Sequence, residues 1–292
     1  MDLKSDYMLD DELRCLLNEL TRKTFGFDFE GWVKGGYFKG DYIPYSLLKD
    51  GKIISNVSAN RMCFMENGVE KNYIQLGTVM TDEEYRGQGL AEKLIKYVVS
   101  EFENICDGIY LFGNLKAVGF YRKMGFAEGV QYRYSVKPEF FPKNKTGDIF
   151  LPVNASDNDM KAKYMDAVLF SAVNSSFDQI NRYGLQMFYT ADRSNLFYSK
   201  DMDCFIVMNS EENSIIIRSI ICKEKVALAD VLQRMEGNYD KCRLGFVPHR
   251  EDMGMCVCEQ YNGGEDYRFF YIGAQLESVQ KQKLYFPELS HA

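Results

Sequence analysis

The residues with the clearest chemical potential are two glycines that precede a predicted helix. The segment Arg86-Gly87-Gln88-Gly89 leads directly into an apolar helical pattern over residues 90–102. Glycine is a poor helix former, so its place here indicates a backbone that a ligand can approach closely. The first N–H groups of a helix have no partner inside the helix and lie at the positive end of its dipole. The segment therefore predicts an anion site, most simply for a phosphate or pyrophosphate.

A predicted strand and a predicted helix flank this loop. Residues 73–80 are rich in β-branched and aromatic side chains, which is typical of a buried strand, and residues 81–85 form a polar turn. In the helix, apolar residues recur at helical spacing and form one face. They are Leu90, Leu94, Ile95, Val98, Val99 and Phe102. Strand, glycine loop and helix start together form the expected anion site.

The rest of the first half predicts an α/β layer around that unit. Asp50-Gly51 and Asn67-Gly68 lie between strand patterns, and such pairs are typical of tight hairpin turns. The other expected elements are helices at residues 10–25 and 28–37, strands at 42–48, 53–63 and 108–112, a helix at 115–124 and a strand at 130–136. This order predicts an α/β domain with a mixed (α+β) sheet.

The second half repeats the order in a weaker form. Its expected elements are a helix at residues 160–173, a hairpin of strands at 204–208 and 215–221, a helix at 226–235, and strands at 242–247, 267–272 and 283–286. The turn before the 226–235 helix, residues 222–225, has no glycine and cannot present backbone amides in the same way. Residues 137–146 carry two prolines and form the best linker candidate. We therefore expect domains at residues 1–136 and 147–292, with the anion site in the first alone.

Bulk properties narrow the classes of partner. The chain has 292 residues and a net charge of −7 that is spread over both halves, which argues against a nucleic-acid surface and mildly favours a cationic substrate. His249 and His291 are the only histidines, so we expect no His-built metal site and no His-centred triad. The eight cysteines fit reduced thiols. No apolar run fits a membrane span or a signal peptide, and we expect a cytoplasmic protein.

Three motifs in order resemble the GCN5-related N-acetyltransferase (GNAT) superfamily. The cofactor motif of that family, Arg or Gln, two residues, Gly, one residue, then Gly or Ala, is matched by Arg86-Gly87-Gln88-Gly89-Leu90-Ala91. The upstream Val-x-Pro is matched by Val79-Met80-Thr81, with Thr where Pro is common. The downstream Asn and Ala-x-x-Phe-Tyr-x-x-x-Gly-Phe are matched by Asn114 and by residues 117–126. The resemblance covers residues 12–136 and implies a GNAT fold.

The resemblance implies an acetyl-CoA-dependent N-acetyltransferase without a metal. Its acceptor would be a primary amine of a small molecule or peptide, which attacks the thioester directly. The pyrophosphate of CoA would bind mainly the backbone N–H groups of Arg86, Gly87, Gln88, Gly89, Leu90 and Ala91. Val79, Met80 and Thr81 would bind the pantetheine arm through their backbone, as an added strand does.

The resemblance also gives Tyr121 and Asn114 roles. Tyr121 would protonate the leaving thiolate, for which a phenol with a pKa near 10 is a suitable donor. Asn114 would hold the cofactor or the start of the helix that carries Tyr121, and an Asn in that place is equally often only a helix cap.

The general base has several candidates. The strand offers Gln75 at the depth where a carboxylate often lies in the family. Asp28, Glu30 and Asp41 lie in segments that line the acceptor side in the family, and the carboxylate of Ala292 or a chain of water molecules are further choices.

The two-domain layout resembles the tandem GNAT proteins with a degenerate second copy, and it is similar to the Eis-type branch, in which the terminal carboxylate reaches the active site. Two other functions stay open. One is a non-catalytic acyl-CoA-binding regulatory module, because an obvious base is missing. The other is an aminoacyl transferase of tandem-GNAT type that uses charged tRNA, which the acidic balance disfavours. An oligomer is compatible with the sequence.

Overall fold

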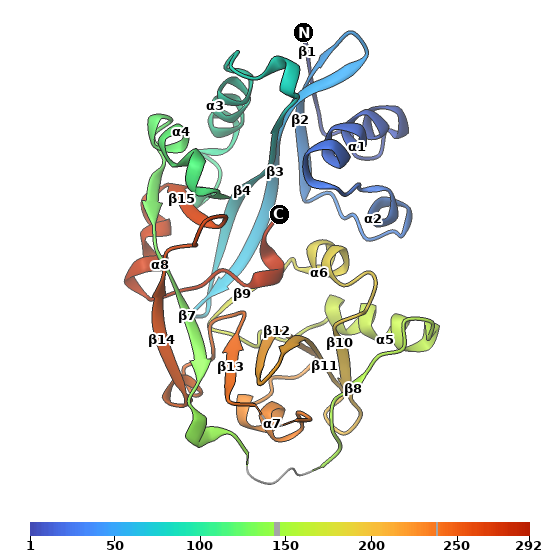
Figure 1. Ribbon diagram of the computed structural model, residues 1–292, viewed down its shortest axis with the longest axis vertical. Coiled ribbons are helices and arrows are strands. Elements are labelled where there is room, and N and C mark those ends of the chain that lie inside the picture. Colours follow the sequence, from blue (N-terminus) through green and yellow to red (C-terminus); the bar gives the residue numbers. More distant parts are fainter. Residues whose placement is uncertain (143–146, 238) are drawn as a thin grey trace.

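Two mixed β-sheets with helices packed on them form the protein, and Figure 1 shows them as an upper and a lower lobe. The structure is a computed structural model, and it describes residues 1–142, 147–237 and 239–292. The predicted α/β fold with mixed sheets is confirmed.

The helices and strands have the following bounds. The α-helices are α1 (Asp11–Phe25), α2 (Glu30–Lys34), α3 (Leu90–Phe102), α4 (Val118–Lys123), α5 (Asn158–Leu169), α6 (Tyr183–Tyr189), α7 (Leu228–Gln233) and α8 (Ser278–Lys281). The 3₁₀ helices are η1 (Glu83–Tyr85), η2 (Leu115–Ala117), η3 (Pro138–Phe140), η4 (Met253–Met255), η5 (Ala274–Glu277) and η6 (Glu288–Ser290). The strands are β1 (Asp2–Ser5), β2 (Tyr42–Lys49), β3 (Lys52–Glu66), β4 (Val69–Thr81), β5 (Gly108–Gly113), β6 (Ala127–Gly129), β7 (Gln131–Val136), β8 (Leu151–Pro152), β9 (Phe177–Gln179), β10 (Leu196–Ser199), β11 (Cys204–Glu211), β12 (Ser214–Cys222), β13 (Lys241–Leu244), β14 (Cys256–Tyr261) and β15 (Arg268–Ile272).

Local signals explain the ends of the first elements. The Asp10 side chain accepts hydrogen bonds from the N–H groups of Glu12 and Leu13, both at 3.0 Å, so α1 begins where its cap lies. Asn67 and Gly68 both have positive φ angles, as a tight hairpin turn requires, and they join β3 to β4. The predicted hairpins of the first half are therefore confirmed.

The first sheet has the order β1-β2-β3-β4-β5-β15-β6, and β9 pairs with β3 off this path. Neighbouring strands are antiparallel except β4 and β5, which are parallel and are joined through α3. Apolar side chains of α3 pack on one face of this sheet together with Tyr121 and Phe270. The other face carries α1 and α2 near the amino end (Figure 1).

The second sheet has the order β14-β7-β13-β12-β11-β10-β8. It repeats the arrangement of the first, because the antiparallel β10, β11 and β12 are followed by helix α7 and by β13, which is parallel to β12. In both sheets, a helix therefore connects the one parallel pair.

Two strands cross between the predicted domains. Strand β7, expected to close the first domain, pairs with β13 and β14 in the second sheet. Strand β15, from the second half, lies between β5 and β6 in the first sheet. The boundary at residues 137–146 stays a prediction, and its residues 143–146 lie outside the described residues. The chain thus exchanges one strand in each direction across that boundary.

Some elements differ from the sequence-based expectation. The elements that were not expected are helix α6 and strands β1, β6, β8, β9, β10 and β14. Residues 283–286 form no strand. Lys283 has a positive φ angle, which interrupts an extended chain, and the residues after it are held by packing of Leu284, Tyr285 and Phe286 in the core.

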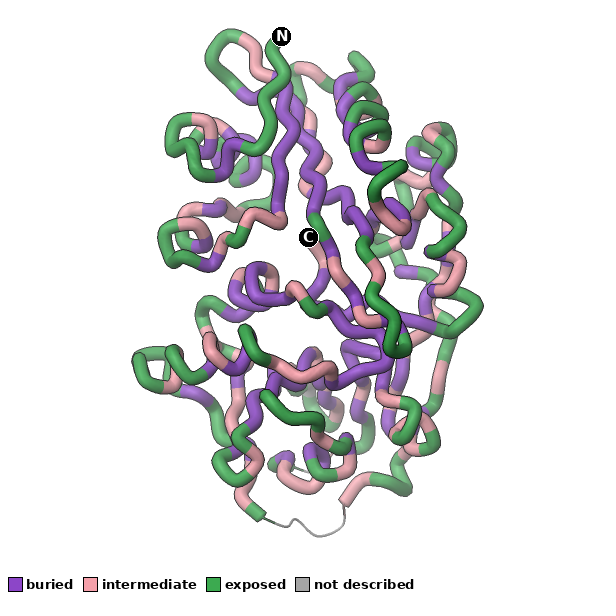
Figure 2. Tube along the Cα trace, turned by 180° about the vertical axis from the view of Figure 1, so that it is seen from behind, coloured by how far each residue is buried: buried purple, intermediate pink, exposed green. Residues whose placement is uncertain are grey.

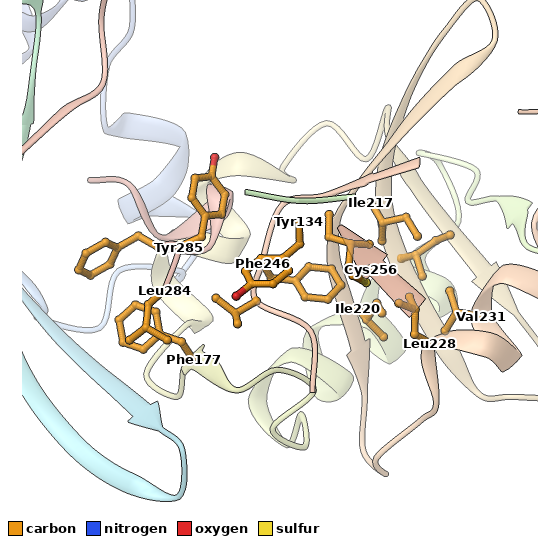
Figure 3. Packing of buried hydrophobic residues seen from close by; sticks show 14 of the residues in the cluster. Tyr134, Phe177, Ile217, Ile220, Leu228, Val231, Phe246, Cys256, Leu284 and Tyr285 are labelled. Carbon is orange, nitrogen blue, oxygen red and sulfur yellow. The ribbon is translucent and has the colours of Figure 1, made fainter. Parts of the chain in front are cut away.

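The largest hydrophobic cluster joins the two lobes. It contains Phe64, Tyr73 and Tyr110 of the first sheet, and also residues of the second sheet and the carboxyl-terminal segment, several of which Figure 3 labels. Buried segments accordingly continue from one lobe into the other in Figure 2. Among the described residues, no helix is long and apolar enough to cross a membrane.

Candidate active site

The glycine loop lies between β4 and α3, as predicted. Gly87 and Gly89 have φ angles of 76° and 73°, which L-residues rarely adopt, and both are exposed. A Cβ atom on either glycine would meet no heavy atom of the described residues within 4 Å, so the space beside this backbone is open. In the described structure no side chain caps the amino end of α3, which leaves its first N–H groups free for a ligand. The Gln88 side chain is exposed.

Strands β4 and β5 open a wedge at their carboxyl ends. Their parallel pairing ends at Leu76 and Leu111, whereas β4 continues through residues 77–81. The antiparallel pairing of β4 with β3 also breaks here, and Thr78, with a φ angle of 39°, forms a bulge. The register between β3 and β4 passes from Gly77 to Met80, so the backbone of Thr78 and Val79 lies outside the regular ladder.

A row of buried polar side chains holds the bulge. The Thr78 hydroxyl shares a hydrogen bond of 2.7 Å with the Tyr42 hydroxyl and donates to Ser58 Oγ at 2.9 Å. The Asn56 amide donates to the carbonyl oxygen of Thr78 at 2.9 Å. Because the whole row is hydrogen-bonded, the unusual backbone of Thr78 is stabilised from three sides. These polar groups form the floor of the site on the α2 side of the sheet.

Met80 and Thr81 complete the exposed end of β4. Met80 is buried, and its carbonyl oxygen accepts a hydrogen bond from Ser55 Oγ at 3.0 Å. Thr81 is partly exposed, and its carbonyl oxygen accepts from Arg86 Nε at 3.3 Å. The side chain of Arg86 therefore lies back on the strand, and its exposed face lies beside the glycines. Leu90 is buried and Ala91 half-buried, which seats the start of α3 on the sheet.

Tyr121 lies on α4 directly against the end of β5. A Cβ atom on Gly113 would lie 2.7 Å from Cε2 of Tyr121, so only glycine at position 113 leaves room for the ring. The ring also packs on Phe270 of the inserted strand β15, with centroids 5.2 Å apart. Burial raises the pKa of Tyr121 to about 12, so the phenol stays protonated over the physiological range. The phenol of this core residue therefore keeps its proton.

Asn114 acts as a helix cap. Asn114 precedes η2, which leads into α4, and its Oδ1 accepts a hydrogen bond of 3.0 Å from the N–H of Ala117, the last residue of η2. The side chain is exposed. Asn114 thus fixes the start of the segment that carries Tyr121.

Two of the candidate bases are engaged in ion pairs. Asp28 accepts hydrogen bonds from Arg22 at 2.7 and 2.9 Å, and these hold its pKa below the usual range. Glu30 pairs with Arg14 and Lys34, both at 2.9 Å, which lowers the pKa of Glu30 to about 2. Carboxylates stabilised in this way are weak bases.

Asp41 has the opposite environment. Burial raises the pKa of Asp41, although a hydrogen bond with Asn181 and the charge of Arg61 oppose this shift. The residue lines a small pocket together with Trp32 and Tyr42. Asp41 is therefore the one of the three acidic candidates whose environment favours proton uptake.

The carboxyl-terminal tail reaches the wedge. A Cβ atom on Gly77 would lie 2.6 Å from the Ala292 carbonyl oxygen, so the tail rests on the backbone of β4 just before the bulge. Gln75 Nε2 donates to the same oxygen at 3.3 Å, and the Tyr189 hydroxyl donates to the carbonyl oxygen of His291. Both figures that trace the chain place the C-terminus between the lobes (Figures 1 and 2).

A family model for the acetyltransferase (GNAT) family matches residues 6–126. This span contains the glycine loop, the wedge and Tyr121. Residues 6–126 belong to the GNAT family. A search of curated proteins found no match.

Solved structures share the fold of nearly the whole chain. A probable N-acyltransferase from Enterococcus faecalis aligns with 95% of this chain and 73% of its own, at 17% identity and a TM-score of 0.58. Eis1 from Mycobacterium abscessus aligns with 92% of this chain and 72% of its own, at 12% identity and a TM-score of 0.55. A GCN5-related N-acetyltransferase from Kribbella flavida aligns with 92% and 71%, at 14% identity and a TM-score of 0.54. The match therefore extends beyond the GNAT domain into the second lobe.

Three residues of the candidate site could not be assigned from the sequence. Thr78, Gly77 and Gly113 have their roles because of the bulge, the tail and the ring of Tyr121, respectively. The sequence does contain a hint for two of them. Gly77 and Gly113 lie in or beside strand patterns, and a glycine there often marks a bulge or a close approach of another segment to the backbone. Among the described residues, no three His, Cys, Asp or Glu side chains gather closely enough to hold a metal ion.

Proposed function

We propose that the protein is an acetyl-CoA-dependent N-acetyltransferase that acts on a primary amine of a small molecule or peptide. The main observation behind this proposal is the wedge between the carboxyl ends of β4 and β5. The open glycine loop, the end of β4 beyond its pairing with β5, and the Tyr121 ring lie at the carboxyl ends of β4 and β5. An acyl thioester with a pyrophosphate at the other end of its arm fits such an arrangement.

The backbone supplies most of the cofactor binding in this proposal. The N–H groups from Gly87 to Ala91 bind the pyrophosphate at the positive end of α3. The arm lies in the wedge and pairs with the backbone of Val79, Met80 and Thr81, as a strand added to a sheet edge. These contacts place the thioester near the bulge.

The reaction is a direct transfer. The amine nitrogen attacks the thioester carbon, the C–N bond forms and the C–S bond breaks. The N–H of Val79 stabilises the negative charge on the oxygen of the tetrahedral intermediate. Tyr121 donates its proton to the sulfur of CoA, and the attacking nitrogen loses a proton to a base.

The base in this proposal is the tail. In a chain that ends at Ala292, the oxygen atoms beside Gly77 are a carboxylate, and Gln75 fixes one of them through a hydrogen bond. Asp41, with its raised pKa, is the alternative, and it acts through water. Ala292 contacts the strand that carries the bulge, which favours it over Asp41.

The test is acetyl transfer to a panel of amines. Amino acids, polyamines, aminoglycosides and short peptides are offered with acetyl-CoA, release of the CoA thiol is recorded, and products are examined by mass spectrometry for an added acetyl group. At least one amine should give both signals. Saturable acetyl-CoA binding with no thiol release across the panel would instead favour the regulatory binding module.

A further inference from the structure

A second pocket, rich in arginine, lies beside the carboxyl-terminal tail. It encloses about 340 Å³. We define the arginine pocket by three basic and three aromatic residues of its lining. They are Arg133, Arg218, Arg243, Tyr261, Tyr267 and Tyr285. They come from β7, β12, β13, β14 and the segments near β15 and η6, so the exchanged strand β7 is part of its wall.

The arginine pocket has more positive than negative charge. Glu288 pairs with Arg218 at 3.3 Å and with Arg243 at 3.1 Å, so one carboxylate serves two guanidinium groups. Arg133 forms no ion pair within the described parts of the chain. The Nε atoms of Arg133 and Arg243 are buried and have no hydrogen-bond partner among the described residues. Buried donors without partners cost free energy, which a bound anion would recover.

Aromatic contacts hold the unpaired arginine in place. The guanidinium carbon of Arg133 lies 3.3 Å from the ring centroid of Tyr261 and 5.7 Å from that of Tyr285. A guanidinium group stacked in this way presents its hydrogen-bond donors at its edges. Arg133 also interacts with the Tyr285 hydroxyl, and its Nε has no partner among the described residues. Its planar fork matches the two oxygens of a carboxylate or phosphate. The pocket therefore combines a fixed hydrogen-bond donor for an anion with aromatic walls.

The arginine pocket is connected to the transfer site through the tail. His291 lines the pocket, and its ring stacks on Phe112 of β5 with centroids 4.1 Å apart. The next residue, Ala292, contacts Gly77 in the wedge. Burial and the nearby Arg218 and Arg133 lower the pKa of His291 to about 3, so the imidazole is neutral and does not offset the arginine charge.

We propose that the arginine pocket binds an anionic group, a carboxylate or a phosphate, of the acceptor whose amine is acetylated at the wedge. This inference rests on the proposed function and deepens it by naming the acceptor class: amines that also carry an anion. The net charge of −7 acts on the whole surface and mildly favours a cationic acceptor, whereas the three arginines act locally on the bound molecule. Local charge decides which acceptor is held.

Binding is tested without turnover by calorimetry. N-acetylphenylalanine and N-acetylphenethylamine share the aromatic body and the acetylamide and differ by one carboxylate, and N-acetyl-O-phosphoethanolamine tests the phosphate. The full chain should bind at least one anionic probe at least 10-fold more tightly than N-acetylphenethylamine. Arg133→Gln and Arg218→Gln should each remove that preference, whereas the exposed Arg250→Gln should retain it. Thermal unfolding identifies any variant that is not folded. If Arg133→Gln does not fold, Arg133→Lys is used, which keeps the charge but loses the planar fork and should weaken the preference.

The outcome is separable from that of the proposed function. Suppose that anion binding depends on Arg133 but that no amine releases the CoA thiol from acetyl-CoA. This result would contradict the proposed acetyltransferase activity and would still support the anion site. Equal binding of all three probes, or anion binding that Arg133→Gln and Arg218→Gln leave unchanged, would overturn the anion site. Acetylation assays then compare kcat/KM within two pairs of amines. A higher value for phenylalanine than for phenethylamine would identify a carboxylate as the bound group. A higher value for O-phosphoethanolamine than for ethanolamine would identify a phosphate.

Discussion

At the scale of single residues, Tyr121 and Gly113 depend on each other. The ring fills the space that a side chain at position 113 would occupy, and Phe270 covers it from the inserted strand. Packing of this kind holds the ring and leaves the hydroxyl as the only group for chemistry. A variant that removes the hydroxyl and keeps the ring therefore separates the two roles.

Tyr121→Phe should lower kcat about 100-fold and leave the KM for acetyl-CoA nearly unchanged, because a general acid contributes in the transition state and not to binding. Thermal unfolding should be nearly unchanged, because the aromatic contacts stay. Thiol release under saturating acetyl-CoA measures the effect. A variant with full kcat would show that another group protonates the thiolate.

The raised pKa of Tyr121 gives a prediction for pH. In the proposed mechanism the neutral phenol is the acid, and a pKa of about 12 keeps that form populated at alkaline pH. The kcat should therefore stay level from about pH 8.5 to pH 10, where a tyrosine with an ordinary pKa near 10 would already lose half of its protons. The measurement is kcat against pH with enzyme-free controls for thioester hydrolysis. A decline centred near pH 10 would contradict the buried acid.

At the scale of elements, the end of β4 brings together the bulge, the proposed binding site of the pantetheine arm and the carboxyl-terminal tail. Gly77 allows the tail to lie on the strand, and Gln75 binds its oxygen. This contact involves backbone of two segments that are far apart in the sequence. It is therefore sensitive to a single added methyl group.

Gly77→Ala should displace the tail, because the new Cβ would lie 2.6 Å from the Ala292 oxygen. We expect activity to fall about 10-fold and stability to fall by about 1 kcal/mol, as for a modest steric insertion. The control is Gly254→Ala, where the Cβ would meet no described heavy atom within 4 Å, and it should match the unmodified protein in both assays. Equal activity of the two variants would mean that the tail takes no part in transfer.

Local patterns predicted most elements of the first half, although strands β1 and β6 were missed. The Asn67-Gly68 turn and the glycines before α3 each act within a few residues, and each has the expected conformation. The bulge at Thr78 could not be predicted, because it depends on side chains of β2 and β3. Strand β14 was missed because its side chains show no clear alternation of buried and exposed positions.

At the scale of the whole molecule, the exchange of β7 and β15 ties the two lobes together. The partner of a strand at the edge of a sheet is a long-range property, and no local pattern distinguishes a strand that stays in its own half from one that crosses. The order of elements was therefore predictable, and the assignment of these two strands to sheets was not. Both exchanged strands contribute to sites, β15 behind Tyr121 and β7 in the arginine pocket.

A fragment of residues 1–142 should not fold by itself. It would lack β15, so β5 and β6 would lose their common partner and the ring of Phe270 would be missing behind Tyr121. We expect no cooperative thermal unfolding for this fragment, and recovery of the transition when a fragment of residues 147–292 is added. Circular dichroism measures the thermal unfolding of the single fragment and of the mixture. A fragment that unfolds cooperatively by itself would show that the exchange is not needed for stability.

The most direct test of the whole account is calorimetric titration of the full chain with acetyl-CoA. The account predicts saturable binding of one acetyl-CoA per chain, weakened at least 10-fold by Gly89→Ala, whose methyl group would lie where the pyrophosphate approaches the start of α3. Gly26→Ala is the matched control, because Gly26 has a φ angle of 79° and the same open surroundings at the end of α1, and it should bind as the unmodified protein does. Absence of saturable binding, or an equal loss in both glycine variants, would contradict the glycine loop as the cofactor site.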